Sequence, residues 1–449
     1  MDKAKIARAD SAGPDIAENV PPIIRYLFYL LIFSIPFETA STETVSIIGS
    51  IPMIIGMGLT VAALLQPRVC FNPPPLAFWC FVGYYVVFLA LGMTEHLDYV
   101  RPVLSRLFTF AQMLLLMWIC FNLFRYPEIS RNAFLIFVIA CAVLSLLHIV
   151  GVGTVTVGQG RSTTFGDNAN TAGVTLSLGL IGLVGITYGR IMVERRMALF
   201  AWTAFPIMGT AIIMTGSRGA LLALIFGIAL LIIRDGDWRT KLKITLIVGL
   251  AISFLAFTAL TDDGMRTRLE RAFYQGDTAG RDKIHALAWM MVYEKPVLGW
   301  GPVYNTVELG SRIGRTTRDP HSLYLTVLTE TGLLGSILFF SGLGLLVRAS
   351  WKARVQIEGA LPMAMLSCLL LFNAAGSGHN RKLFWVILAY VLASASSFRD
   401  ATRHAPPQFF DPINVADQGM RDFASSPQAP NIGPHRSSMN PKRDLPNQL

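Results

Sequence analysis

Long apolar runs separated by short polar loops occupy most of this chain. We read twelve of them, most near the roughly 20 residues that an α-helix needs to cross a bilayer. Charged residues make up only 15% of the chain, against about 25% in soluble proteins. The sequence therefore predicts an all-α integral membrane protein with about 12 transmembrane helices. The predicted spans are 23–37, 45–65, 76–93, 101–124, 132–151, 171–188, 198–215, 219–233, 243–261, 321–347, 358–375 and 382–397.

The positive charges of the short loops give these helices an orientation. With the N-terminus in the cytoplasm, the cytoplasmic short loops hold thirteen Lys and Arg residues and the opposite ones hold five. Because short cytoplasmic loops are normally the more positive ones, we expect both termini in the cytoplasm. Residues 1–22 are then a cytoplasmic tail. Residues 398–449, rich in Pro, Ser and Asn, are expected to form a disordered cytoplasmic tail.

One loop of the 23–397 membrane domain is much longer than the others. It covers residues 261–320 on the predicted outer face. Apolar residues recur at helical spacing between Ile284 and Val292, which predicts a helix lying on the membrane surface. The run Gly299-Trp300-Gly301-Pro302 predicts a turn with an aromatic ring at headgroup depth. We therefore expect one long extracytoplasmic loop that carries short surface helices.

The composition argues against several other classes of protein. The net charge of +10 is spread over loops and tails without a nucleic-acid-binding motif, so we expect no nucleic-acid partner. The five cysteines lie in or beside apolar runs and read as buried small hydrophobes. Asp235-Gly236-Asp237 matches the D-x-D pattern of metal-dependent sugar transferases, but it falls in a cytoplasmic loop. Asp262 and Asp263 lack further ligands, so we expect no metal site.

Cationic residues gather on the predicted outer face, where positive charge is least expected. Arginine presents a planar fork that matches phosphate oxygens. Histidine titrates near neutral pH and can accept a proton from a hydroxyl group. Together they point to an anionic, membrane-borne substrate that is handled outside the cytoplasm. The residues concerned are Arg161, Arg218, Arg281, Arg312, Arg315, Arg318 and His321.

Several of these residues stand in recognisable short runs. The runs are Arg161 to Asn170, Thr215-Gly216-Ser217-Arg218-Gly219-Ala220, Gly280-Arg281 followed by Leu298 to Pro302, and His321 to Leu325 followed by Glu330 to Gly335. In this order they resemble the motifs of the O-antigen ligase and O-antigen polymerase superfamily. Thr164 before Phe165, and Ser322 after His321, depart from the family's commoner residues.

The resemblance implies an all-helical membrane glycosyltransferase. Its donor would be a glycan on undecaprenyl pyrophosphate, and it would need no metal or other cofactor. His321, Arg218 and Arg281 would be catalytic, with the arginines on the leaving pyrophosphate. The expected partners are the lipid-linked glycan, membrane lipid, and a polysaccharide chain-length regulator or export machinery. The active site would face the periplasm from the bacterial inner membrane. Expected substrate-binding residues are Arg161, Asn170, Trp300, Arg312, Arg315, Arg318 and Glu330.

Each candidate also has a plainer interpretation. An arginine beside a span, such as Arg218, can be an interface anchor. Arg161 and Arg281 can be solvated loop residues, and His321 can cap a helix. The asparagines at 168 and 170 can cap the sixth span.

Glu330 is a separate case because it falls inside the tenth predicted span. It follows His321 by nine residues, so in a regular helix the two point to opposite faces and lie roughly 13 Å apart along the axis. A direct pair is therefore not expected. Arg106, in the fourth span, is a candidate partner for a buried Glu330, and an intramembrane carboxylate can also be a site residue.

A polymerase is the preferred function, and three alternatives compete with it: a ligase, a transporter and a non-catalytic scaffold. A polymerase and a ligase cut the same sugar–pyrophosphate bond and differ in the acceptor. The long loop and the extra cations Arg312, Arg315 and Arg318 favour a polymerase that makes exopolysaccharide or O-antigen-like chains. A ligase that transfers the glycan to lipid A core is the alternative. A lipid-linked glycan transporter should show more charge inside the spans and pseudo-repeats, and a non-catalytic scaffold should tolerate loss of the arginines.

Overall fold

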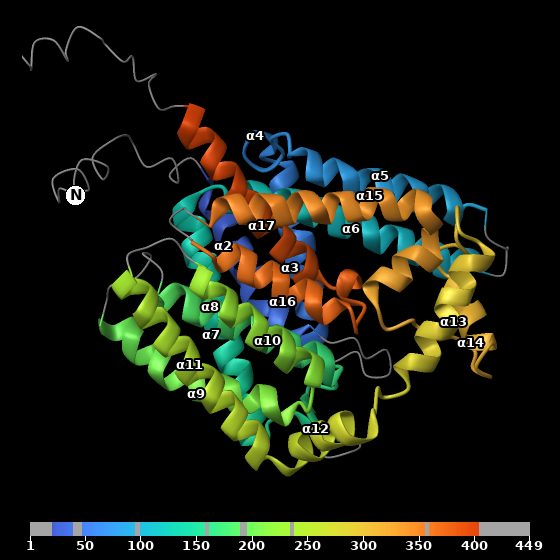
Figure 1. The fold of residues 1–449 in the computed structure, drawn as a ribbon. Coiled ribbons are helices and arrows are strands. Elements are labelled where there is room, and N and C mark those ends of the chain that lie inside the picture. The colour runs from blue at the N-terminus through green and yellow to red at the C-terminus, as the bar shows by residue number, and fades with distance from the viewer. Residues whose placement is uncertain are drawn as a thin grey trace, which may run out of the picture. The chain divides into compact units, whose positions relative to one another are not determined.

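The computed structural model describes residues 20–38, 47–94, 99–157, 161–188, 195–233, 238–354 and 359–403. Most of both predicted tails and the Asp235-Gly236-Asp237 run lie outside these described residues. Helices account for most of the described chain, and Figure 1 shows them as a bundle. The all-α class predicted from the apolar runs is therefore confirmed.

Each of the twelve predicted spans coincides with a helix. Five of these, α6, α7, α8, α11 and α15, are long and apolar enough to cross a membrane, and the other seven are shorter apolar helices. Twelve crossings therefore stay a prediction. The bounds are α2 Pro22–Ser34 with η2 Ile35–Phe37, α3 Ile47–Leu64, α5 Leu76–Gly92, α6 Val100–Phe124, α7 Pro127–Val150, α8 Ala169–Tyr188, α9 Arg195–Met214, α10 Arg218–Leu230 with η4 Leu231–Ile233, α11 Trp238–Thr261, α15 Leu323–Ala353, α16 Leu361–Asn373 and α17 Lys382–Arg403. Two short pieces, α4 Pro67–Cys70 and η5 Gly378–Asn380, lie in loops.

The loop before α8 contains a small β-hairpin that the apolar pattern does not predict. Strand β1 (Thr154–Val157) pairs antiparallel with β2 (Arg161–Thr164). The strands are short and rich in Val and Thr, which suit extended backbone. His148 at the end of α7 anchors the hairpin through hydrogen bonds to the hydroxyls of Ser162 (2.8 Å) and Thr164 (2.6 Å). The hairpin thereby fixes Arg161, its first β2 residue.

The long loop folds into three helices, α12 (Asp263–Gln275), α13 (Arg281–Glu294) and α14 (Tyr304–Ser311). Figure 1 shows them in yellow tones on one side of the bundle. The predicted helix around residues 284–292 is therefore present as α13. Its apolar face, however, is not the free membrane-binding surface that we expected, because Ile284 and Met291 pack against Leu309 of α14.

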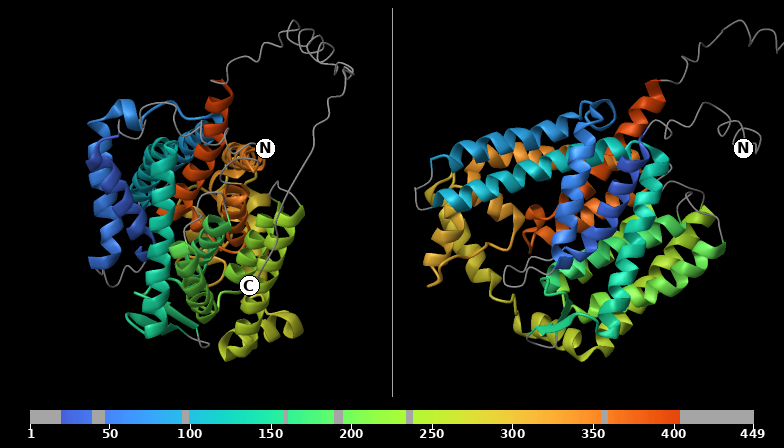
Figure 2. Two further views of the ribbon diagram at one scale, coloured as in Figure 1. Left: turned by 90° about the vertical axis from the view of Figure 1, so that its left-hand side faces the viewer. Right: turned by 180° about the vertical axis from the view of Figure 1, so that it is seen from behind.

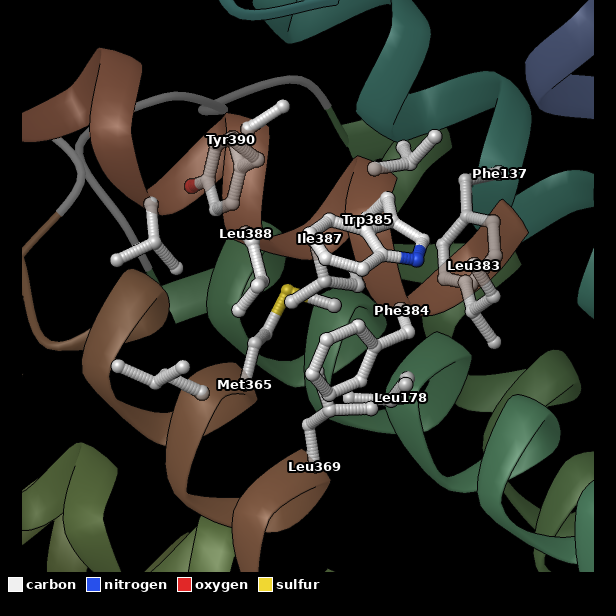
Figure 3. Close-up of a cluster of buried hydrophobic side chains, with 14 of the residues drawn as sticks. Phe137, Leu178, Met365, Leu369, Leu383, Phe384, Trp385, Ile387, Leu388 and Tyr390 are labelled. Carbon is white, nitrogen blue, oxygen red and sulfur yellow. The ribbon is translucent and has the colours of Figure 1, made fainter. Parts of the chain in front are cut away.

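The buried core is densest around α17. Trp385 is fully buried there and donates a hydrogen bond to the carbonyl of His379 at 2.7 Å. Figure 3 shows Trp385 and Phe384 packed with Leu178 of α8 and Met365 of α16. Helices α5 and α15 run alongside each other at another part of the bundle, as Figures 1 and 2 show. This packing gives the loops at the helix ends a rigid support.

Helix α15 is broken at Gly332, whereas the sequence predicted a continuous span over 321–347. Gly332 has φ 59° and ψ −158°, which only glycine adopts without strain. The backbone groups released by the break bond to residues 296–301, which we call the docking segment. The bonds are Trp300 N to Thr329 O (2.7 Å), Gly301 N to Glu330 O (3.0 Å), Leu333 N to Pro296 O (2.8 Å) and Leu334 N to Val297 O (3.1 Å).

The docking segment and α15 approach each other so closely that two glycines are required. A Cβ on Gly299 would lie 2.7 Å from the backbone nitrogen of Gly332, and a Cβ on Gly332 would lie 2.4 Å from the carbonyl carbon of Val297. Irregular backbone inside a membrane domain needs such internal partners. The Leu298–Pro302 and Glu330–Gly335 runs are therefore explained by packing between the long loop and the bundle.

Candidate active site

The turn between α9 and α10 positions Arg218. Gly216 takes a left-handed conformation with φ 62°. The Ser217 hydroxyl then accepts the backbone N–H of Ala220 at 3.3 Å and caps α10. Arg218 is consequently the first residue of α10. Its Nη1 donates to the carbonyl of Arg268 at 3.0 Å, and its Nη2 lies 3.6 Å from a carboxylate oxygen of Asp277.

Arg161 reaches the same turn from the β-hairpin. Its Nε donates to the Thr215 carbonyl at 3.1 Å and its Nη2 to the Asn170 side-chain oxygen at 2.9 Å. A Cβ on Gly216 would lie 2.8 Å from the Cγ of Arg161, so glycine makes room for this contact. Asn170 thus holds Arg161, while Asn168 accepts the backbone N–H of Asn170 at 2.9 Å as a cap of α8.

Four partly buried arginines lie close enough to influence one another, and we call them the arginine cluster: Arg161, Arg218, Arg268 and Arg281. Burial lowers the pKa of Arg161 to about 10, and the charges of the other three add to this effect. Burial also lowers the pKa of Arg281, with the charge of Arg218 as the second cause. Asp277 lies beside Arg218, and its side chain is partly exposed.

The cluster has the electrostatics of an anion-binding site. Arg218 and Arg281 each occupy the first position of a helix, α10 and α13. The partial positive charge of a helix N-terminus disfavours a cation and favours an anion. The charges of the cluster also contribute to the lowered pKa of Arg161, Arg268 and Arg281, after burial, which indicates a positive field that suits a ligand with several negative oxygens.

Arg268 was missed by the sequence analysis. It lies on α12 among other charged residues and belongs to none of the recognised runs. Its Cδ would lie 3.5 Å from a Cβ on Gly216, so its place in the cluster depends on how α12 folds back over the α9–α10 turn. No local pattern in the sequence carries that information.

His321 lies two residues before the first residue of α15, close to the helix N-terminus that was predicted, in a constrained conformation. Its φ of 55° is unusual for a residue other than glycine. Asp319 stabilises this geometry, because one carboxylate oxygen accepts the backbone N–H of His321 at 2.5 Å and the hydroxyl of Ser377 at 2.7 Å. The same oxygen lies 3.7 Å from His321 Nδ1. Asp319 is a second residue that the sequence analysis did not single out.

The surroundings of His321 favour its neutral form. Burial lowers the pKa of its imidazole, Asp319 opposes this shift, and the charges of Arg318, Arg281 and His285 add to it. His285 follows Arg281 by one turn of α13, and its own pKa is lowered by burial and by Arg281. A neutral imidazole can accept a proton at neutral pH, so His321 is suited to be a base.

The other predicted binding residues have different surroundings. Arg312 bonds to Glu294 (2.5 and 2.8 Å) and to Glu308 (2.8 and 2.9 Å), so its charge is neutralised within the loop. It also lies 5.4 Å from the ring centroid of Trp300, which stacks on Tyr304. Trp300 therefore packs inside the loop. Arg315 is exposed, and Arg318 is half-buried near His321.

Glu330 is buried inside the bundle. Its carboxylate is fully buried, 2.5 Å from Nη2 of Arg106 and 3.3 Å from the hydroxyl of Tyr84. The candidate partner named from the sequence is thus its partner in the structure. Breaking such a buried pair is strongly destabilising, which makes Glu330 a structural residue in this geometry.

Residues 203–340, which are less than half of the chain, match the model of the O-antigen ligase family. The matched part runs from α9 into α15 and includes Arg218, Arg268, Arg281 and His321, while Arg161 and Asn170 precede it. No curated protein matches the sequence. Most of the arginine cluster and His321 thus fall in the segment that matches the O-antigen ligase family, which confirms the resemblance found in the sequence for this part of the chain.

Proposed function

We propose that this chain is a membrane glycan transferase whose arginine cluster binds the pyrophosphate of an undecaprenyl-linked donor. The observation that carries the proposal is the cluster itself, four partly buried arginines that lie within electrostatic range of one another, with Arg281 also within range of the neutral base His321. A lipid pyrophosphate supplies the negative oxygens that this field favours.

The reaction follows from these positions. A hydroxyl oxygen of the acceptor attacks the anomeric carbon of the donor sugar and forms the new glycosidic bond. The bond to the pyrophosphate oxygen breaks, and its electron pair leaves with the lipid pyrophosphate. The hydroxyl proton passes to the imidazole of His321. Arginines at the leaving group stabilise the charge that grows in the transition state. They supply the charge compensation that a divalent cation would otherwise provide, so chelators should leave transfer unchanged.

Within this function we propose a polymerase that joins repeat units into exopolysaccharide or O-antigen-like chains at the periplasmic face of the inner membrane. A polymerase holds two lipid-borne glycans at once. Arg315 and Arg318 precede His321 and have no ion pair among the described residues, so they are candidates for the second pyrophosphate. Arg312 is a weaker candidate than its sequence position suggested, because Glu294 and Glu308 hold it. A chain-length regulator or export machinery would act on the product.

Ligation of the glycan to lipid A core is the second candidate, supported by the name of the matched family. Deletion of the gene followed by analysis of the carrier lipid separates the two. Loss of a polymerase should leave single repeat units on the carrier. Loss of a ligase should leave long chains on the carrier that never reach the terminal acceptor. Long carrier-bound chains in the deletion strain would therefore contradict our choice.

A further inference from the structure

A cavity of about 240 Å³ borders His321 and Asn170. These two residues also border the arginine cluster, since Asn170 holds Arg161 and the charge of Arg281 acts on His321. None of the four cluster arginines is among the described residues that line the cavity. Its walls come from the end of α2–η2, from α8, from α16, from the start of α17 and the segment between these two helices, and from Asp319. The cavity is therefore a compartment separate from the arginine cluster.

The charges around this cavity are the reverse of those in the arginine cluster. Three carboxylates line it, those of Glu38, Asp167 and Asp319. The lining cation Arg381 bonds to Asp167 at 2.7 Å, and Lys382 bonds to Glu38. Positive charge at the cavity is thus already paired among the described residues, and the wall keeps a negative balance. Such a wall disfavours a phosphate and suits an uncharged ligand with hydroxyl donors.

The lining also fits one particular class of uncharged ligand. Hydroxyl and amide side chains, such as Thr171, Ser377 and Asn168, alternate with the apolar surfaces of Phe372 and Phe384. A sugar ring has a rim of hydroxyl groups and two less polar faces, so it can use both kinds of surface. The volume of about 240 Å³ is below the roughly 300–1,000 Å³ of pockets for drug-sized ligands, which matches one sugar residue and not a whole repeat unit.

We propose that this cavity is the acceptor subsite, which binds one uncharged sugar residue and presents its hydroxyl group to His321. The proposal rests on the proposed function, since it divides the substrates of that reaction between two compartments. The arginine cluster takes the pyrophosphate of the donor. The cavity selects the acceptor sugar, so acceptor specificity depends on residues of α8 and of the α16–α17 segment and not on the arginines.

Filling the cavity tests the proposal. The full-length protein would be assayed with lipid-linked repeat units extracted from the deletion strain as donor, and the free repeat-unit oligosaccharide as acceptor. Thr171→Phe should raise the KM for the oligosaccharide about tenfold or more. Its affinity for undecaprenyl pyrophosphate, measured by direct binding, should stay within about twofold of the wild-type value. Thr175→Leu, one turn further along α8, fills the same cavity if Thr171→Phe does not fold.

A control variant separates cavity filling from other effects. Thr203→Phe adds the same ring at an exposed position of α9 and should leave the acceptor KM nearly unchanged. Unchanged acceptor KM in both filling variants, or a loss confined to undecaprenyl pyrophosphate binding, would overturn the subsite while the proposed function stands. If wild-type protein binds the oligosaccharide, Thr171→Phe abolishes that binding, and no transfer occurs, the subsite stands and the proposed function fails.

Discussion

Arg218 and Arg281 share an unfavourable position, because each places a guanidinium at the positive end of a helix. Burial raises this cost further and the charge of Arg218 adds to it, and both lower the pKa of Arg281. Such an arrangement lowers the stability of the protein alone. It becomes favourable when an anion with several oxygens occupies the space between the side chains.

Removing a cluster arginine should therefore affect catalysis more than folding. We expect Arg218→Ala, Arg268→Ala and Arg281→Ala each to cost on the order of 3 kcal/mol in the transition state, roughly a hundredfold in transfer rate. Lysine at the same positions should restore activity only in part, since the bidentate fork is lost. Transfer rate and protein level in the membrane are the measurements. Arg266→Ala, an exposed residue of α12 paired with Glu270, is the matched control.

The pH dependence should report the state of His321. A base acts in its neutral form, so the rate falls as pH drops through the His321 pKa, which lies below the ordinary 6.5. Arg318→Ala removes a charge that lowers this pKa, so the acidic limb of kcat/KM should move to higher pH. Asp319→Asn removes the opposing charge and should move that limb to lower pH, together with a lower kcat from lost positioning. Shifts in the same direction for both variants would exclude His321 as the titrating base.

The sequence could identify the residues that lie in compact runs, such as Arg218, Arg281 and His321. It could also name Arg106 as the partner of Glu330, because a buried carboxylate needs a cation. It could not identify Arg268 or Asp319, whose roles depend on how distant segments meet. Nor could it show that Glu294 and Glu308 hold Arg312. The pair with Glu294 joins the last residue of α13 to the residue that follows α14.

At the level of elements, the break in α15 is the feature that the hydropathy pattern hides most completely. Apolar residues continue through Gly332, so the pattern predicts one span. The break is possible because the docking segment provides hydrogen-bond partners for the backbone. The β-hairpin was missed for a similar reason, since strands of four residues give too short an alternation to detect.

Glycine substitutions test the docking of the long loop. Gly332→Ala puts a Cβ against the Val297 carbonyl in a left-handed conformation, and Gly299→Ala puts one against the backbone of residues 329–332. Each should destabilise the protein by more than about 1 kcal/mol. Gly344→Ala, also on α15 but with open space around the added Cβ, should have no such effect or a small stabilising one. Thermal unfolding of the protein in detergent compares the three. Equal stability of all three variants would contradict this account of the docking.

Across the whole membrane domain, the loops that were predicted on one face converge at the candidate site. Glu38, Asp167 and Arg381 come from three of these loops and meet in one network of ion pairs and hydrogen bonds. The hydrogen bond from Arg161 to the carbonyl of Thr215 also joins two of these loops, the loop before α8 and the α9–α10 turn. The convergence is what the charge bias of the short loops implied, although the direction in which this face points stays a prediction.

Labelling in intact cells tests that direction. Ser311→Cys, at the exposed end of α14, should react with a membrane-impermeant thiol reagent added from outside. Lys352→Cys, exposed at the other end of α15, should react only after the membrane is permeabilised. Four of the five native cysteines are buried, which keeps the background low. The reverse pattern would place the candidate site in the cytoplasm and contradict the proposed periplasmic reaction.

The docking of residues 296–301 on residues 329–334 also restricts how such a protein can recombine with its relatives. The two segments are separated along the chain but share one set of backbone hydrogen bonds. A hybrid with a junction between them would combine a docking segment from one parent with a helix break from the other, and its hydrogen bonds would depend on matching lengths and glycines. Junctions in α11 and after Leu334 would exchange both together. The long loop, with Arg281 and His321, should therefore be inherited as one block with the start of α15.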